Sequence, residues 1–236
     1  MGTLDIAISL PTRNRPQLVA RLVDSLYATA DRPEWITVYA YVDDDDQLTV
    51  PALLKLQAVY PGRIKYMVGP RITLSDIHNK LYPLMTEDVM FVTGDDVVAR
   101  TQGWDTQVLQ KFNSVPDKIL QVYGDDLYQG GPTNVFIHRR WADALGYLSP
   151  PYFSSDYSDT WLAELAKRLD RQYKLPFVME HMHFANGKAP MDATYTENRR
   201  RYQQDRPDEI YKRMADLRDN DYNKLKRLLD TPYVRP

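Results

Sequence analysis

Two kinds of segment alternate along the first hundred positions of the chain. Short apolar runs, each typical of a buried strand, occupy residues 5–10, 36–42, 64–68 and 89–92. Between these runs, apolar residues recur every three or four positions, as on one face of a helix, most clearly over residues 16–26, 48–60 and 74–84. Strands that alternate with helices predict an α/β fold, with a parallel sheet that is covered by helices on both faces.

Local signals mark where the predicted helices begin and end. Pro16 suits the first turn of a helix, and Pro61 with Gly62 ends the second helix. Thr73 is followed three positions later by Asp76, which resembles a capping box at the start of the third helix. These signals agree with the apolar pattern.

Acidic residues follow two of the predicted strands directly. The run ITVYAYV leads into residues 43–46, which are all aspartate, and VMFV leads through Thr93 and Gly94 into Asp95 and Asp96. Ligands of open α/β sheets bind beyond the carboxyl ends of the strands, so the two acidic ends would form one negative pocket. One isolated acidic run would indicate a solvated loop. Two runs at strand ends instead favour a hard cation such as Mg²⁺ or Mn²⁺.

Basic and polar residues are placed where they could reach a phosphate near this pocket. Arg13 and Arg15 follow the first strand, and His78, Asn79 and Lys80 lie on the helix that precedes VMFV. Each of them could also be an ordinary surface residue. The sequence lacks GxxxxGK[ST], the motif of a phosphate-binding P-loop. It also lacks GxGxxG after the first strand, which argues against a dinucleotide-binding site.

Composition excludes several other kinds of site. The chain of 236 residues has no cysteine, so disulfides, zinc–thiolate sites and cysteine nucleophiles are ruled out. A net charge of −2 gives no overall attraction to nucleic acid or membrane. No apolar run approaches the roughly 18 residues of a membrane span, and the N-terminus lacks the pattern of a signal peptide. We therefore expect a cytoplasmic protein.

The order of these motifs resembles a known family. PTRNRP, then VDDDD, IHNK, and VTGDD followed by Gly103 and Trp104, are similar to the motifs of GT-A glycosyltransferases of the family 2 type. The resemblance implies a Rossmann-like, mostly parallel sheet flanked by helices. It covers residues 1–190, with a nucleotide-sugar half over 1–100 and an acceptor half over 101–190. Residues 191–236 would form a helical C-terminal extension.

The resemblance also implies a donor and a metal ion. The donor would be a nucleoside diphosphate sugar, expected to be a UDP-sugar, bound with Mn²⁺ or Mg²⁺. Asp43 would hold the nucleoside, and Asp95 would bind the metal, although the first aspartate of the family's DXD motif corresponds to Thr93 here. The full set of donor-contacting residues implied is Pro11, Thr12, Arg13, Arg15, Asp43, Asp45, His78, Asn79, Lys80, Gly94 and Asp95.

The second half would supply a catalytic base and a further metal ligand. Asp156 and Asp159 stand at the start of a predicted helix; Asp159 matches the family's base better, although either acid could simply cap the helix. His181 and His183 alternate along a strand and so point the same way. The resemblance suggests that one of them, with His183 favoured, completes the metal shell. Trp104, Asp125 and Asp156 are expected to contact the acceptor.

One motif points elsewhere. Residues 123–126 read YGDD, which also marks the palm hairpin of RNA-dependent polymerases, but the chain is too short for fingers, palm and thumb. Asp125 and Asp126 would instead lie on the acceptor-side wall or in a turn.

The activity implied is a single inverting displacement, in which Asp159 deprotonates an acceptor hydroxyl. A nucleotidyltransferase of related fold is an alternative, although it would normally carry a glycine-rich loop where PTRNRP stands. A non-catalytic binder of nucleotide sugars is another.

The acceptor is expected to be a saccharide or another small hydroxyl compound. Residues 186–236, however, carry 12 Lys and Arg against 9 Asp and Glu, and Pro207 can open a helix there. Arg199, Arg200 and Arg201 form the densest basic cluster. This cluster would be a solvated surface on the plainer interpretation, and a contact for an anionic acceptor such as hydroxymethylated DNA on the other.

Overall fold

The computed structural model describes residues 4–128 and 131–235. Within this part the chain builds an eight-stranded sheet in the order β3-β2-β1-β4-β7-β6-β8-β5. The strands are β1 (Ile6–Thr12), β2 (Ile36–Asp43), β3 (Ile64–Gly69), β4 (Val89–Val92), β5 (Val97–Ala99), β6 (Gln121–Asp125), β7 (Val135–His138) and β8 (Gln172–His181).

The four strands predicted from apolar runs lie side by side in parallel. β1 pairs with β2 on one side and with β4 on the other, and β3 extends the sheet beyond β2. All residues of β1 and β2 are buried, as their apolar sequences require. The second half adds antiparallel pairs, because β7 runs against both β4 and β6, and β5 runs against β8. The predicted α/β fold with a mostly parallel sheet is confirmed.

Helices cover both faces of the sheet. α1 (Pro16–Thr29), α2 (Thr49–Val59) and α4 (Trp104–Ser114) pack against one face, and α3 (Leu74–Leu81), α5 (Arg139–Leu145) and α6 (Ser158–Arg168) against the other. Successive strand residues serve the two cores in turn: Val89 and Phe91 face the first, and Met90 faces the second. Short 3-10 turns span Pro33–Trp35, Tyr82–Leu84 and Phe184–Asn186.

The predicted helix signals are confirmed where they can be checked. Pro16 is the first residue of α1, and the Thr73 hydroxyl accepts a hydrogen bond of 3.2 Å from the Asp76 amide at the start of α3. Among the described residues, no helix has both the length and the apolar character needed to cross a membrane.

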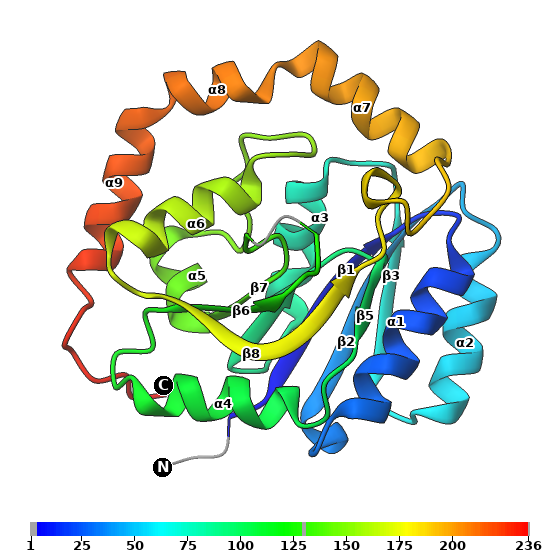
Figure 1. Ribbon diagram of the computed structural model, residues 1–236, viewed down its shortest axis with the longest axis horizontal. Coiled ribbons are helices and arrows are strands. Elements are labelled where there is room, and N and C mark those ends of the chain that lie inside the picture. The colour runs from blue at the N-terminus through cyan, green and yellow to red at the C-terminus, as the bar shows by residue number, and fades with distance from the viewer. Residues whose placement is uncertain (1–3, 129–130, 236) are drawn as a thin grey trace.

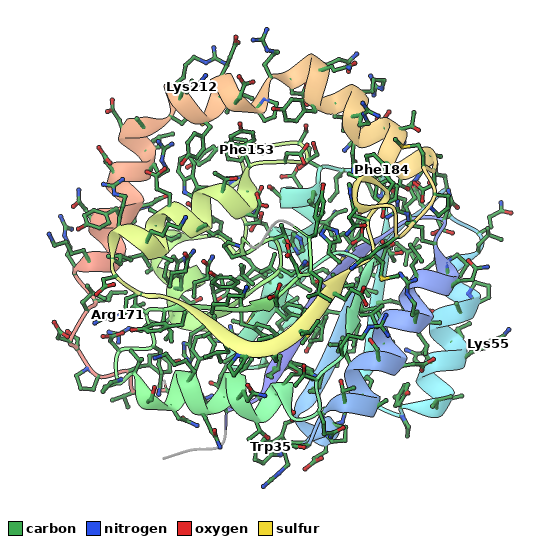
Figure 2. The ribbon with its side chains drawn as sticks, in the orientation of Figure 1. Trp35, Lys55, Phe153, Arg171, Phe184 and Lys212 are labelled. Atoms are coloured by element: carbon green, nitrogen blue, oxygen red, sulfur yellow. The ribbon has the colours of Figure 1, made fainter. Side chains whose placement is uncertain are left out.

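Three helices follow one another at the C-terminus. α7 (Ala193–Asp205), α8 (Pro207–Arg213) and α9 (Ala215–Lys226) form an arc around α3 and α6 (Figure 1). The arc is anchored at its far end, because Leu225 is completely buried in the second core and the Tyr147 hydroxyl donates to Asp221. Figure 2 shows Lys212 pointing away from the arc and Phe153 lying inside it. The arc thus begins at the carboxyl edge of the sheet with α7, and the chain then returns to the amino edge, where Arg235 lies 3.2 Å from Asp88 beside the start of β4.

Candidate active site

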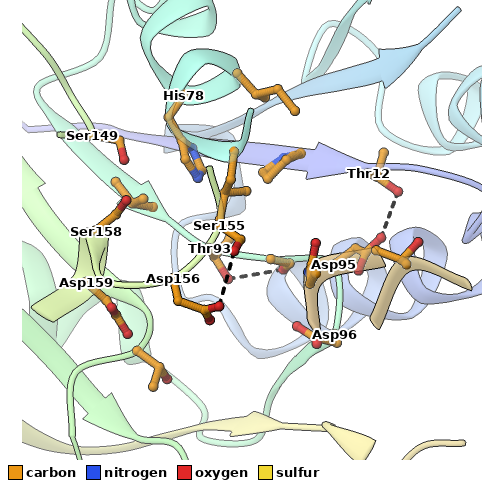
Figure 3. Close-up of a pocket in the computed structure, with 18 of the residues that line it drawn as sticks. Thr12, His78, Thr93, Asp95, Asp96, Ser149, Ser155, Asp156, Ser158 and Asp159 are labelled. Carbon is orange, nitrogen blue, oxygen red and sulfur yellow. Dashed lines mark hydrogen bonds between the residues drawn. The ribbon is translucent and has the colours of Figure 1, made fainter. Parts of the chain in front are cut away.

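A cavity of about 370 Å³ lies at the carboxyl ends of β1, β2 and β4. Asp43 from the end of β2 and Asp95 and Asp96 from the turn after β4 all line it, and β1 lies between these two strands. The expectation that the two acidic strand ends form one pocket is therefore confirmed. Figure 3 shows Asp156 and Asp159 on the side of this cavity that is opposite Thr12.

Most of the residues predicted for the site line the cavity. They are Pro11, Thr12, Arg13, Arg15, Asp43, His78, Gly94 and Asp95 from the first half, and Asp156, Asp159, His181 and His183 from the second. The structure thus brings residues from both halves of the chain to one place.

One of the predicted acceptor contacts is contradicted, and another lies outside the cavity. Trp104 is completely buried in the core beneath the sheet, where its Nε1–H donates to the Leu26 carbonyl over 3.3 Å. Trp104, which follows VTGDD in the sequence, therefore packs in the core and does not reach an acceptor. Asp125 lines neither this cavity nor the second one described below, and its carboxylate accepts a hydrogen bond of 3.0 Å from Lys174 at the surface.

Three predicted donor contacts also lie outside the cavity lining. Asn79 is engaged in structure: its Oδ1 accepts from the amides of Leu148 and Ser149 over 2.8 and 2.9 Å. Lys80 is exposed on α3, because the helix turns it away from the cavity. Asp45 is exposed, and its carboxylate accepts a hydrogen bond of 3.2 Å from Arg13 Nε.

One end of the cavity holds a buried acid between two arginines. The Asp43 carboxylate lies 3.1 Å from Arg13 Nε and 3.8 Å from Arg71 Nε. Burial raises the pKa of Asp43, while the two arginines act in the opposite direction. Arg71 was missed by the sequence analysis, although it closely follows the end of β3 and the strand-end rule could have found it.

The Asp95 carboxylate is fully engaged by the protein itself. It accepts hydrogen bonds from Thr12 Oγ1 over 2.8 Å and from Arg15 Nη1 over 3.0 Å. Arg15 also donates to both oxygens of Asp192 over 2.8 Å and stacks over the Tyr195 ring at 4.1 Å. Burial raises the pKa of Asp95 to about 6, against the opposing effect of Arg15.

Asp96 makes a different set of contacts, which includes a histidine. Its Oδ2 accepts from the Tyr195 hydroxyl over 2.8 Å and lies 3.3 Å from His181 Nε2. Burial acts to raise the pKa of Asp96, but the hydrogen bonds from His181 and Tyr195 prevail and lower it to about 2. For His181 burial acts to lower the pKa, and the bond to Asp96 outweighs it and raises the pKa.

The pair Asp96 and His181 has the chemistry and spacing of two metal ligands. Neighbouring ligands of an octahedral Mg²⁺ or Mn²⁺ lie about 3 Å apart, close to the observed 3.3 Å. His183 is less suitable, because its Nδ1 accepts from the Ala185 amide over 3.2 Å and caps a 3-10 turn. In the described ranges no group of three or more His, Cys, Asp or Glu side chains could hold a metal ion. Any ion here would need further ligands from substrate or water.

Two serines, Ser149 and Ser158, contribute to the cavity lining. The hydroxyl of buried Ser75 joins them, because it lies 2.9 Å from the Ser158 hydroxyl and accepts from the Ser149 hydroxyl over 3.1 Å. Nearby, His78 Nδ1 lies 2.7 Å from the Ser9 hydroxyl, and burial lowers the pKa of His78 to about 3. His78 is therefore neutral at ordinary pH. This part of the cavity offers uncharged hydrogen-bonding groups, which suit a polyhydroxylated ligand.

Asp156 and Asp159 lie at the entrance to α6. The N-cap residue is Tyr157, no side chain caps the helix, and Asp159 instead accepts from the Thr160 amide over 2.7 Å. The capping role considered for these acids is therefore not observed. Burial raises the pKa of both carboxyl groups, and the nearby charge of Asp156 raises the pKa of Asp159 further. A raised pKa is what a general base near neutral pH requires.

The C-terminal helix α7 completes the cavity, with Tyr195, Asn198 and Arg201 among its lining residues. No sequence signal indicated this, since Tyr195 reaches Asp96 across 99 positions of sequence. The basic cluster does not form one face: Arg201 faces the cavity, Arg200 pairs with Glu197 at 2.7 Å, and the Arg199 guanidinium lies 6.0 Å from the Phe184 ring centre.

No protein-family model matches this sequence, and no curated protein matches it either. Solved structures do match. They include the mannosyltransferase PcManGT from Pyrobaculum calidifontis in complex with GDP-Man and Mn²⁺, with 14% identity over 97% of this chain and 74% of that one and a TM-score of 0.60. GalNAc-T7 with UDP, GalNAc and Mn²⁺ matches with 10% identity over 77% of this chain and a TM-score of 0.63.

S. aureus TarS 1-349 in complex with UDP matches with 12% identity over 74% of this chain and a TM-score of 0.55. This chain spans 59% of that TarS fragment and 44% of the GalNAc-T7 chain, so it is shorter than these two proteins. At such low identities the likeness shows the fold. The chain has the GT-A fold that these glycosyltransferases share.

Proposed function

We propose that this protein is a glycosyltransferase that moves a sugar from a nucleoside diphosphate sugar to an acceptor hydroxyl. One observation carries the proposal. Acids from the ends of β2 and β4 and from the start of α6 line a single cavity, together with Arg13, Arg15, Arg71 and Arg201. The neighbours that share this fold were solved with GDP-Man, UDP and Mn²⁺, which supports a nucleotide-sugar donor and a divalent ion.

The residues divide the cavity into a nucleoside end and a sugar end. Asp43, held by Arg13 and Arg71, would accept hydrogen bonds from the nucleoside. The cationic side chains of Arg71 and Arg201 would face the diphosphate, because charge-assisted contacts favour arginine for phosphate. The neutral hydroxyls of Ser149 and Ser158 would contact the sugar.

Asp96 and His181 would hold the divalent ion. This replaces the pair Asp95 and His183 expected from the sequence, since Asp95 is bound by Arg15 and Thr12 and His183 caps a turn. When bound, the ion would neutralise the negative charge that develops on the departing diphosphate. Asp95 would instead fix Arg15 next to the site.

Asp159 would act as the general base of an inverting displacement. It would take the proton of the acceptor hydroxyl as that oxygen forms a bond to the anomeric carbon. The bond between this carbon and the diphosphate oxygen breaks at the same time, and the nucleoside diphosphate leaves with both bonding electrons. The raised pKa of Asp159 prepares it for proton transfer, and its position on two cavities allows contact with an acceptor.

Thermal-shift measurements with a panel of nucleotide sugars, each with and without Mn²⁺, test the proposal. A ligand that binds only the folded protein raises its apparent stability by mass action. We expect UDP- or GDP-sugars to raise the midpoint more with Mn²⁺ than without it. A panel in which no nucleotide sugar shifts the midpoint would contradict a donor site.

A further inference from the structure

A second cavity opens beside the first and shares residues with it. It has a volume of about 380 Å³ and lies between α6, α8 and residues 131–133. Asp159 and Thr133 line both cavities. A molecule in the second cavity would therefore meet the proposed donor site at the proposed base. The volume lies within the range of small-molecule sites.

One face of α6 forms a long wall of this cavity. Asp159, Ala163 and Lys167 follow one another at intervals of four residues, so they lie on one stripe of the helix. Asp159 marks the end that joins the donor cavity. Lys167 lies eight residues further along, which corresponds to about 12 Å of helix axis.

The charges at the two ends of this wall, on Asp159 and Lys167, differ in sign. Glu164, which also lines the cavity, is neutralised by Arg218 at 2.9 Å and Arg168 at 3.5 Å. Lys167 is exposed and forms no ion pair within residues 4–128 and 131–235, whereas Lys174, Lys188 and Lys224 each pair with a carboxylate. The cavity thus has a carboxylate at its inner end and a free ammonium at its outer end.

The opposite wall comes from the C-terminal arc. Tyr211 of α8 lines the cavity, its hydroxyl donates to Glu164, and the Arg218 guanidinium lies 3.9 Å from its ring centre. The ring is therefore held in one orientation. An aromatic wall combined with hydroxyl groups such as that of Thr160 suits a hydroxylated ring such as a sugar.

On the basis of the proposed function, we propose that this cavity is the acceptor site and that it selects an anionic saccharide. The reacting hydroxyl would lie at Asp159. A phosphate or carboxylate on the next ring would contact Lys167, since the spacing of about 12 Å spans roughly two sugar rings. The C-terminal arc would then serve both substrates, with α7 on the donor side and α8 on the acceptor side.

The test uses the full chain with the nucleotide sugar found by thermal shift. Initial rates are measured with neutral disaccharides (maltose, lactose, cellobiose) and with their 6-phosphates. We expect the phosphates to have a three- to fivefold lower KM in the wild type, as a single exposed ion pair provides. Lys167→Met should remove this preference, and Lys167→Glu should reverse it.

Lys55→Glu is the matched control, because Lys55 is an exposed lysine on α2, far from α6 in the fold (Figure 2). It should leave the preference as in the wild type. Equal KM values for neutral and phosphorylated disaccharides, or a preference that survives Lys167→Glu, would overturn the inference while turnover of the donor still supports the proposed function. Transfer to hydroxymethylated duplex DNA instead of any disaccharide would also overturn it. Absence of donor binding would remove the proposed function and this inference together.

Discussion

The guanidinium of Arg15 donates a hydrogen bond of 3.0 Å to the carboxylate of Asp95, and both groups are buried. The same guanidinium donates two further hydrogen bonds of 2.8 Å to the carboxylate of Asp192. Asp192 is the N-cap of α7, so one arginine ties the end of β4 to the start of the C-terminal arc. The position of α7 over the donor cavity depends on this connection.

Substitutions of Asp192 should separate its two roles. Asp192→Ala removes the bond to the Tyr195 amide and the partner of Arg15, whereas Asp192→Ser can keep the helix cap and loses only the ion pair. We expect Asp192→Ala to reduce the free energy of unfolding by about 1 kcal/mol more than Asp192→Ser. Urea denaturation of both variants measures this difference. Equal losses would show that the cap contributes nothing.

Replacing Asp95 or Asp96 by asparagine should affect Mn²⁺-dependent nucleotide binding to different extents. Asp96→Asn removes a proposed metal ligand, so we expect Mn²⁺-dependent binding of UDP or GDP to weaken by roughly 10- to 100-fold or more. Asp95→Asn should have a smaller effect on Mn²⁺, because Asp95 contacts Arg15 and Thr12. Calorimetric titration with Mn²⁺ and nucleotide compares the two. A larger loss in Asp95→Asn would restore the metal pair expected from the sequence.

Asp159→Asn should abolish proton transfer and keep the shape of the site. We expect turnover to fall by roughly 10²- to 10⁴-fold while donor binding persists. Asp156→Asn serves as the control, since Asp156 lines the donor cavity but not the second cavity. The roles would be exchanged if only Asp156→Asn lost turnover.

The pH dependence of turnover gives a further check on the same residue. A base must be deprotonated to act, and burial raises the pKa of Asp159. Activity should therefore fall, as pH decreases, at a pH above the ordinary aspartate value of about 3.9.

Much of the fold could be predicted because its strands and helices depend on residues that are close together in the sequence. The strand at residues 89–92 and the Thr73 cap depend on apolar runs and on one side chain close in sequence. That Asp43 and Asp95 line one cavity could be predicted, because ligands of α/β sheets bind beyond the carboxyl ends of the strands. Trp104 was mistaken for a site residue because sequence position alone does not distinguish a buried tryptophan from an exposed one.

The roles within the site depend on contacts that are distant in sequence. Tyr195 and Asp192 come from α7, and only the folded arc brings them to Asp96 and Arg15. The proposal of His181 rather than His183 as a metal ligand likewise depends on a local cap that no periodicity reveals. For this reason the acidic pocket can be predicted from the sequence, whereas its C-terminal wall cannot.

Two buried histidines should make the protein less stable in acid. Burial lowers the pKa of His78 and of His138 to about 3, so the unfolded chain binds their protons more readily than the folded chain. Stability contributed by the neutral form is present above the unfolded pKa of about 6.5 and is lost as pH falls below it. Each histidine should lower the free energy of unfolding by about 2 kcal/mol at pH 5 relative to pH 7.

His78→Asn should therefore reduce the loss of stability between pH 7 and pH 5 by about 2 kcal/mol, as measured by urea denaturation at both values. His138→Asn should produce a similar reduction. A pH dependence identical to that of the wild type in both variants would show that these histidines are not held neutral.

The most direct test of the account is a measurement of donor turnover. The wild type and Asp159→Asn are incubated with Mn²⁺, the nucleotide sugar that stabilises the protein most, and the disaccharide panel, and the products are identified by mass spectrometry. We predict that the wild type releases a nucleoside diphosphate and forms an acceptor that is one sugar heavier, and that Asp159→Asn does neither at a comparable rate. Release of pyrophosphate, or a donor that stays intact with every acceptor, would contradict the assignment as a glycosyltransferase.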